Sequence, residues 1–218
     1  IRELALEGAP EGTRAVAAMP TAGRGRMGRA WQAPKDSGIW MSLLLRPDIP
    51  PMQASVLTLL TGIAIAEAIE EVTDVEVGIK WPNDIYYNDQ KLVGILIENT
   101  LSGRHIAYTI AGVGINVNQT QWLSNAPNPV SMKQITGEEY DVENLLNAFL
   151  EAIQRWETAS TEQLREEYIK HLYRRTGWHP YLEREVSVAP TNIQLSAQAA
   201  DGVFLAQWVD ITPQGEWV

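Results

Sequence analysis

The segment richest in chemistry is TAGRGRMGR, from Thr21 to Arg29. Its three glycines let main-chain N–H groups approach an anion closely, and Arg24, Arg26 and Arg29 add planar, permanently charged donors for phosphate or carboxylate oxygens. The spacing also fits a dinucleotide fingerprint, but that motif needs a helix directly after the loop, and Trp31 and a strand-like run follow instead. We therefore predict an anion-binding loop, with a solvated basic loop as the alternative.

A second set of side chains, KWPND at residues 80–84, stands where a strand ends. The proline fixes the direction of the chain, so its neighbours point to defined places. Asn83 offers a donor and an acceptor suited to a base or ureido edge. Lys91 opens the following apolar run and could face developing negative charge, as phosphoryl chemistry requires. An ordinary turn and a solvated strand edge remain the alternative for these residues.

A third motif, GVGIN at residues 112–116, ends another strand with two glycines and Asn116. Glycine inside a strand indicates close approach of a ligand or of another backbone, although a simple bulge is an equal alternative. The three histidines are scattered without metal-ligand spacing, so the sequence predicts no protein metal site.

The elements that must position these motifs alternate between strands and helices. We expect strands at 14–19, 39–45, 75–81, 91–99 and 105–116, the last two joined by a turn at 102–103. We expect helices at 1–9, 52–72, 141–156, capped by Asp141, and 161–175, with irregular chain at 21–37 and 119–137. From residue 185 the pattern changes to short strands separated by turns.

Composition narrows the class of protein. An apolar fraction of 45% and a charged fraction of 20% are typical of a globular protein, and the apolar run near 56–69 is broken by polar residues, which favours a buried helix over a membrane span. The net charge of −10 argues against non-specific nucleic-acid binding. The absence of cysteine and of a visible export signal predicts a cytoplasmic protein.

The order of four motifs, TAGRGRMGRAW, KWPND, KLVGILIE and GVGIN, resembles the bacterial biotin–protein ligases. The resemblance covers about residues 1–180, and residues 181–218 resemble an SH3-like β module that is cut short. It implies an α+β fold with a mixed central β-sheet flanked by helices, similar to lipoate ligases and class II aminoacyl-tRNA synthetases. It also implies ATP, biotin and Mg²⁺ as ligands, and a lysine of the biotin carboxyl carrier protein as the acceptor.

The resemblance also implies roles for individual residues. Lys91, Arg26 and Asp84 would be catalytic, with Asp84 orienting or deprotonating the incoming amine. Contacts to biotin and the adenylate would come from Thr21, Gly23, Arg24, Gly25, Arg26, Arg29, Trp31, Lys91 and Gly94. Contacts to adenine would come from Asn83, Asn116 and Trp122.

Two alternatives stay open. The family usually has glutamine directly before Thr21, where this chain has Pro20, so a ligase of the same architecture for lipoate or octanoate is one alternative. A homologue that binds ligands without turnover is the other. The sequence shows no DNA-binding helix-turn-helix, so we expect a ligase without repressor function, and the resemblance favours a homodimer.

Overall fold

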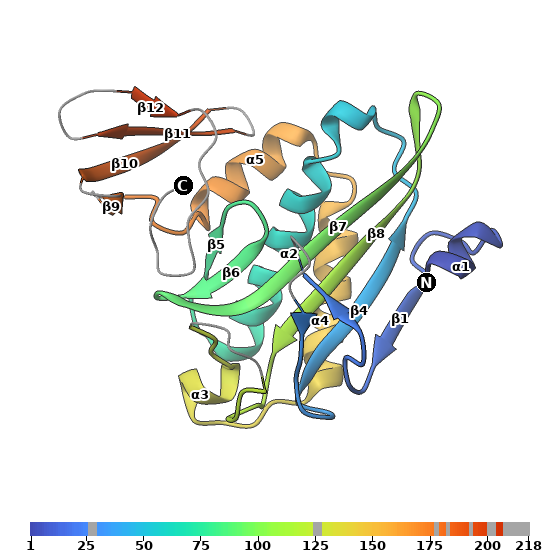
Figure 1. The fold of residues 1–218 in the computed structure, drawn as a ribbon, viewed down its shortest axis with the longest axis horizontal. Coiled ribbons are helices and arrows are strands. Elements are labelled where there is room, and N and C mark those ends of the chain that lie inside the picture. The colour runs from blue at the N-terminus through green and yellow to red at the C-terminus, as the bar shows by residue number, and fades with distance from the viewer. Residues whose placement is uncertain are drawn as a thin grey trace.

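The computed structural model describes residues 1–25, 30–123, 128–176, 179–181, 184–191, 194–199 and 204–206. Its centre is a six-stranded sheet in the order β1-β4-β8-β7-β6-β5 (Figure 1). The strands are β1 (Arg14–Ala17), β4 (Gly38–Leu45), β5 (Gly78–Lys80), β6 (Asp84–Tyr87), β7 (Gln90–Ser102) and β8 (His105–Asn116). The predicted α+β class, with a central sheet flanked by helices, is confirmed, but this sheet is antiparallel and not mixed as predicted. Each pair of neighbouring strands in this sheet is antiparallel, and parallel pairing among the described residues is limited to isolated bridges.

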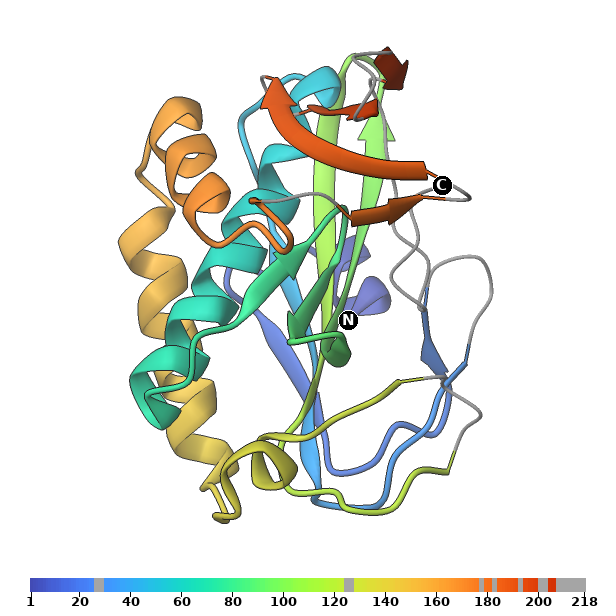
Figure 2. The same cartoon turned by 90° about the vertical axis from the view of Figure 1, so that its left-hand side faces the viewer.

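Three helices cover one face of the sheet: α2 (Val56–Thr73), α4 (Val142–Trp156) and α5 (Thr161–Lys170) (Figure 2). Side chains alternate across a strand, so Ile39, Met41 and Leu43 of β4 all enter the core beneath these helices. Asp141 caps α4 as predicted, because its carboxylate accepts a hydrogen bond from the main-chain N–H of Glu143 at 2.9 Å.

Helix α2 is long and apolar enough, by length and composition, to cross a membrane. However, 61% of its most apolar window is buried inside the protein, where α2 packs between the sheet and the other two helices. The helix therefore serves as the main support of the sheet, in agreement with the buried helix expected from the sequence.

The opposite face of the sheet is covered only in part. Helix α1 (Arg2–Leu6) packs there, on a small cluster made of Ala5, Leu44, Tyr108 and Ile110. Arg46 fastens the helix, since its guanidinium donates hydrogen bonds to the main-chain oxygens of Ala5 and Ala9 at 3.1 and 2.8 Å.

Several elements differ from the sequence-based expectation. No strand is predicted at residues 84–87, yet β6 forms there, because the turn at 81–83 reverses the chain and lets Asp84 pair with Lys80. The strand expected at 75–81 is shortened to β5, since the N–H of Val77 bonds to the Glu70 carboxylate (3.1 Å). Helix α3 (Met132–Thr136) lies within the expected irregular segment and is started by a capping box formed by Ser131 and Gln134.

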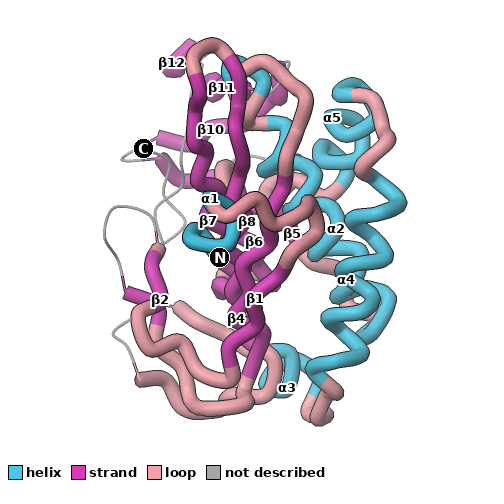
Figure 3. Tube along the Cα trace, turned by 90° about the vertical axis from the view of Figure 1, so that its right-hand side faces the viewer, coloured by secondary structure: helices cyan, strands magenta, loops and turns pink. Residues whose placement is uncertain are grey.

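The chain expected to be irregular at 21–37 contains a short β-ribbon. Strand β2 (Gly23–Arg24) pairs antiparallel with β3 (Ala30–Trp31), and residues 26–29 between them lie outside the described residues. Figure 3 shows β2 on the side of the sheet away from α2 and α4. The ribbon thus stands over the open face of the sheet.

The final strands form a separate four-stranded antiparallel sheet in the order β12-β11-β10-β9. They are β9 (His179–Tyr181), β10 (Arg184–Thr191), β11 (Gln194–Ala199) and β12 (Phe204–Ala206). A β module is therefore present where one was expected, while its SH3-like identity and the boundary at residue 181 stay predictions. The turns expected at 201–202 and 213–215 lie outside the described residues.

Candidate active site

A row of small and polar residues crosses the open face of the sheet. The register pairs Trp40 of β4 with Gly114 of β8, Gly114 with Gly94 of β7, and Gly94 with Asp84 of β6. Residues directly opposite one another on neighbouring strands point to the same face. The two glycines therefore form a floor without side chains, with an indole at one end and a carboxylate at the other.

The indole ring of Trp31 lies on this glycine floor. A Cβ atom added to Gly94 would be 2.6 Å from Cζ3 of Trp31, and one added to Gly114 would be 3.0 Å from Cε2. Both distances are shorter than carbon–carbon contact, so only glycine lets the ring lie this low. Trp31 also packs against Trp40, with ring centroids 5.9 Å apart. The ribbon β2–β3 thus carries an aromatic wall onto two strands far from it in sequence.

A cation stands at the carboxylate end of the floor. Nζ of Lys91 is 2.7 Å from Oδ1 of Asp84, and both side chains are mostly buried. The same Nζ lies 5.4 Å from the centre of the Trp31 ring. The predicted grouping of Lys91, Asp84, Gly94 and Trp31 is therefore present in the structure. A lysine held this way can contact a carboxylate or phosphate placed on the floor.

The two predicted asparagines hold the frame of the site. Nδ2 of Asn83 donates to the main-chain oxygen of Ile95 at 2.8 Å, and Ile95 N–H returns a bond to Asn83 O at 2.8 Å. Asn116 is 3% exposed, and its Nδ2 donates to the main-chain oxygens of Val130 (3.1 Å) and Lys91 (3.4 Å). Both amides are engaged with the protein here, so their predicted contact with adenine stays a prediction.

The other predicted site residues are not brought to the Lys91–Asp84 pair by a described contact. Thr21, before β2, is exposed, and Gly25, directly after β2, is half-buried. Nη2 of Arg24 is 3.7 Å from Oε2 of Glu98 on β7, with the arginine side chain 69% exposed. Gly23 pairs with Trp31 across the ribbon, where an added Cβ would be 2.7 Å from the main-chain oxygen of Trp31.

Three further predictions concern the loops. Arg26 and Arg29 lie outside the described residues, so their proposed contacts with the intermediate and with phosphate remain predictions. Trp122 is half-buried near the end of the described segment 30–123, and its role as a cover over adenine also remains a prediction.

Sequence reasoning missed Trp40 as a site residue. The signal was present in the strand GIWMSLLL. Trp40 and Ser42 point to the same face of the sheet, opposite to the face on which Ile39 and Met41 enter the core. However, a tryptophan in a strand is ordinarily a packing residue. Only the register with Gly114 reveals that its ring borders the glycine floor.

The negative charge of Asp84 also affects a buried tyrosine beneath the site, Tyr168. The hydroxyl of Tyr168 on α5 is buried and has no hydrogen-bond partner among the described residues. Burial raises the pKa of this phenol, and the negative charge of Asp84 raises it further. Its ring packs edge-on against Trp81 of the KWPND motif, with centroids 6.2 Å apart. Tyr168 thus stays neutral and supports the strand end from below.

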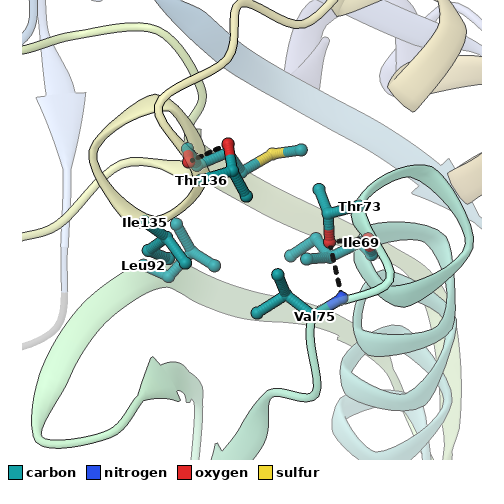
Figure 4. Close-up of a pocket in the computed structure, with 7 residues that line it drawn as sticks. Ile69, Thr73, Val75, Leu92, Ile135 and Thr136 are labelled. Atoms are coloured by element: carbon teal, nitrogen blue, oxygen red, sulfur yellow. Dashed lines mark hydrogen bonds between the residues drawn. The ribbon is translucent and has the colours of Figure 1, made fainter.

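A shallow hollow on the helix-covered face does not compete as a ligand site. Figure 4 shows it between the end of α2, α3 and Leu92 of β7, lined by apolar and threonine side chains. Nothing in that lining can bind a phosphate or carboxylate strongly. Within the part of the chain that the structure describes, no three His, Asp or Glu side chains are grouped to hold a metal ion.

Comparison with protein families matches residues 2–116 to the Biotin/lipoate A/B protein ligase family. The matched region includes Trp31, Trp40, Asp84, Lys91 and both glycines of the floor. The bifunctional ligase/repressor BirA of Bacillus subtilis is 46% identical over 144 residues, which is 64% of this chain and 44% of that protein. The biotin–[acetyl-CoA-carboxylase] ligase of Paracoccus denitrificans is 32% identical over 148 residues, covering 62% of this chain and 59% of that protein. The chain thus spans about half the length of these relatives.

Solved structures agree with this match. The biotin protein ligase from Aquifex aeolicus in complex with biotin and ATP superposes with a TM-score of 0.67 and 26% identity, covering 100% of this chain and 92% of that one. The biotin protein ligase from Leishmania major in complex with biotinyl-5-AMP gives a TM-score of 0.67 and 25% identity over 94% of this chain and 92% of that one.

Proposed function

The chain belongs to the biotin/lipoate A/B protein ligase family, and from that premise we propose that it is a biotin–protein ligase. In the first step an oxygen of the biotin carboxylate attacks the α-phosphorus of ATP, and pyrophosphate leaves. In the second step a lysine amine of a biotin carboxyl carrier protein attacks the acyl carbon of biotinyl-5′-AMP. The amine loses a proton, an amide forms, and AMP leaves.

The observation that carries this proposal is the glycine floor with Lys91 at its end. Because the Trp31 ring lies directly on Gly94 and Gly114, we place the acyl chain against the exposed part of this ring, with its carboxylate toward Lys91, whose Nζ is 5.4 Å from the ring centre. A lysine there stabilises the negative charge that grows on the carboxylate and α-phosphate oxygens as the bond forms. Asp84 holds the ammonium in place and is our candidate for orienting the acceptor amine in the second step.

The remaining roles follow the family resemblance. We propose that Arg26 retains the adenylate, that Arg24 and Arg29 contact phosphates, and that Asn83, Asn116 and Trp122 surround adenine. Mg²⁺ would enter with ATP, because this ion binds mainly through substrate phosphates and one or two carboxylates rather than through a protein cage. A cytoplasmic location, in keeping with the lack of cysteine, and a homodimer complete the proposal.

Pro20 keeps one alternative open, a ligase for lipoate or octanoate. This proline packs beside Gly23, where an added Cβ would be 3.2 Å from the proline Cβ, and Gly23 in turn pairs with Trp31 across the ribbon. Pro20 therefore lies next to the ribbon that carries Trp31, but it offers no amide to a ureido group.

The test compares the three acids in ATP–pyrophosphate exchange catalysed by the full chain. We expect exchange to depend on biotin, with lipoate and octanoate much weaker. Exchange with lipoate or octanoate but not with biotin would identify the chain as a lipoate or octanoate ligase. Tight binding of biotin in calorimetry without any exchange would instead indicate a homologue that has lost turnover.

A further inference from the structure

Gln119 follows β8 by three residues and is almost fully buried, with 3% of its surface exposed. Its Nε2 donates to Oδ1 of Asn116 at 2.5 Å. Its own Oε1 is buried and has no hydrogen-bond partner among the described residues. Burying an oxygen without a donor costs about 1–3 kcal/mol, so this side chain is a poor choice for stability alone.

The orientation of both amides is dictated by two main-chain carbonyls. The oxygens of Lys91 and Val130 can only accept hydrogen bonds, so Asn116 must turn its Nδ2 toward them, as observed. Asn116 Oδ1 is then left facing Gln119, which must present its Nε2. These orientations leave Oε1 of Gln119 without a donor. The same series of hydrogen bonds links Gln119, through Asn116, to the main chain of Lys91.

The amides of Asn116 and Gln119 belong to a network of hydrogen bonds around the main chain of Lys91. The N–H of Lys91 donates to Asn128 O at 2.7 Å, and the N–H of Val130 donates to Lys91 O at 2.9 Å. From the end of β8, Asn116 bonds to the main chain of both Lys91 and Val130. The main chain of Lys91 is therefore held by hydrogen bonds on one side, while its Nζ reaches Asp84 on the other.

We propose that Gln119 is a positioning residue for adenylate formation, acting through Asn116 on Lys91; this inference rests on the proposed function, in which Lys91 faces the reacting carboxylate. Gln119 touches neither substrate in this role. It locks the Asn116 amide in the one orientation that holds the Lys91 main chain. A displacement of about 1 Å of a positioned catalytic group can cost up to about 10²-fold in rate.

The variant that tests this is Gln119→Met, which keeps the length and burial of the side chain but cannot donate. One buried oxygen is orphaned in the wild type, Gln119 Oε1, and one would be orphaned in the variant, Asn116 Oδ1. The melting temperature should therefore change little. In biotin-dependent ATP–pyrophosphate exchange, we expect kcat to fall about tenfold with a nearly unchanged KM for biotin, because the glycine floor is not altered.

Asn118 provides a matched control in the same segment. Its Nδ2 donates to Tyr140 O at 2.8 Å and its Oδ1 accepts from Tyr140 N–H at 3.0 Å, so it ties the segment to the start of α4 rather than to Lys91. Asn118→Ala should lower the melting temperature and leave kcat at a low assay temperature unchanged. Gln119→Met should show the reverse pattern.

A second comparison uses Asn116→Asp, which keeps the acceptor for Gln119 but removes the donor to Lys91 O. If both changes act through one chain of contacts, the double variant is no slower than Asn116→Asp alone. Additive losses, a kcat of Gln119→Met equal to wild type, or a loss of kcat explained by a fall in melting temperature would each overturn the positioning role.

The proposed function is tested separately by Lys91→Ala. Full activity of that variant contradicts the role of Lys91 itself. An inactive Lys91→Ala beside a fully active Gln119→Met contradicts only the inference about Gln119.

Discussion

Replacing Gly94 with alanine should impair the chemistry more than the fold. The added Cβ would be 2.6 Å from Cζ3 and 3.2 Å from Cη2 of Trp31, about 1 Å inside normal carbon contact. Trp31 is only partly buried, so its ring can move off the floor, and we expect a loss of stability of at most about 1 kcal/mol. For a chain of this size that corresponds to a fall of about 2–4 °C in Tm.

The new methyl group pushes the Trp31 ring away from Gly94, and the displaced ring enters the space where we place the acyl chain. A misplacement of about 1 Å at this point should lower kcat/KM for biotin-dependent pyrophosphate exchange by about 10- to 100-fold, or about 1.4–2.8 kcal/mol. Calorimetric melting and exchange kinetics on the same preparation separate the two effects.

Gly112 offers a control on the same face of β8, one row from Gly114. A Cβ there would meet nothing nearer than the main-chain oxygen of Leu96 at 3.4 Å, which is ordinary contact. Gly112→Ala should therefore cost much less activity than Gly94→Ala. Equal losses in the two variants, or full activity of Gly94→Ala, would refute the account of the glycine floor.

Three other changes give separate tests. Asp84→Asn removes the negative charge 2.7 Å from Nζ of Lys91 and should slow transfer to the carrier lysine more than pyrophosphate exchange. Single-turnover measurements of each step can compare the two effects. Equal slowing of both steps would argue against a role of Asp84 in the transfer step. The hydrogen bond that His171 donates to the Glu70 carboxylate raises the pKa of His171. The ion pair therefore stabilises the fold fully below about pH 6.5, and this contribution is lost as pH rises above that value through the raised pKa. The Tm difference between wild type and His171→Gln should therefore shrink from about pH 6 to about pH 9, and a difference that grows would contradict the assignment. Arg46→Met removes the guanidinium bonds that hold α1 and should lower stability by about 1–3 kcal/mol in urea unfolding, without changing KM for biotin; an unchanged unfolding midpoint would mean that α1 is held by its apolar contacts alone.

The central strands and the long helices could be predicted because their apolar patterns are strong. The hairpin β7–β8 and helix α4 each combine a clear period with a turn or a cap. Strand β6 could not be predicted, because its pairing with β5 depends on the chain reversal at 81–83 rather than on its own four residues. The same limit hid the ribbon β2–β3, whose two-residue strands are too short to carry a period.

The candidate site shows the same division. The family resemblance implied that Lys91, Asp84, Gly94 and Trp31 belong to one site, and the structure brings these four residues together. Trp40 and Gln119 could not be found from residue type, since each is important only through its neighbours. Trp40 depends on the strand register, and Gln119 depends on an amide orientation set by carbonyls distant in sequence.

The most direct measurement follows covalent transfer of radiolabelled biotin to a biotin carboxyl carrier domain in the presence of ATP. The wild-type chain should leave a label on the carrier that survives denaturation, and Lys91→Ala should reduce the initial rate by about 10²- to 10³-fold. A carrier that stays unlabelled with the wild-type chain, or that is labelled equally fast by Lys91→Ala, would contradict the claim that Lys91 at the end of the glycine floor drives this reaction.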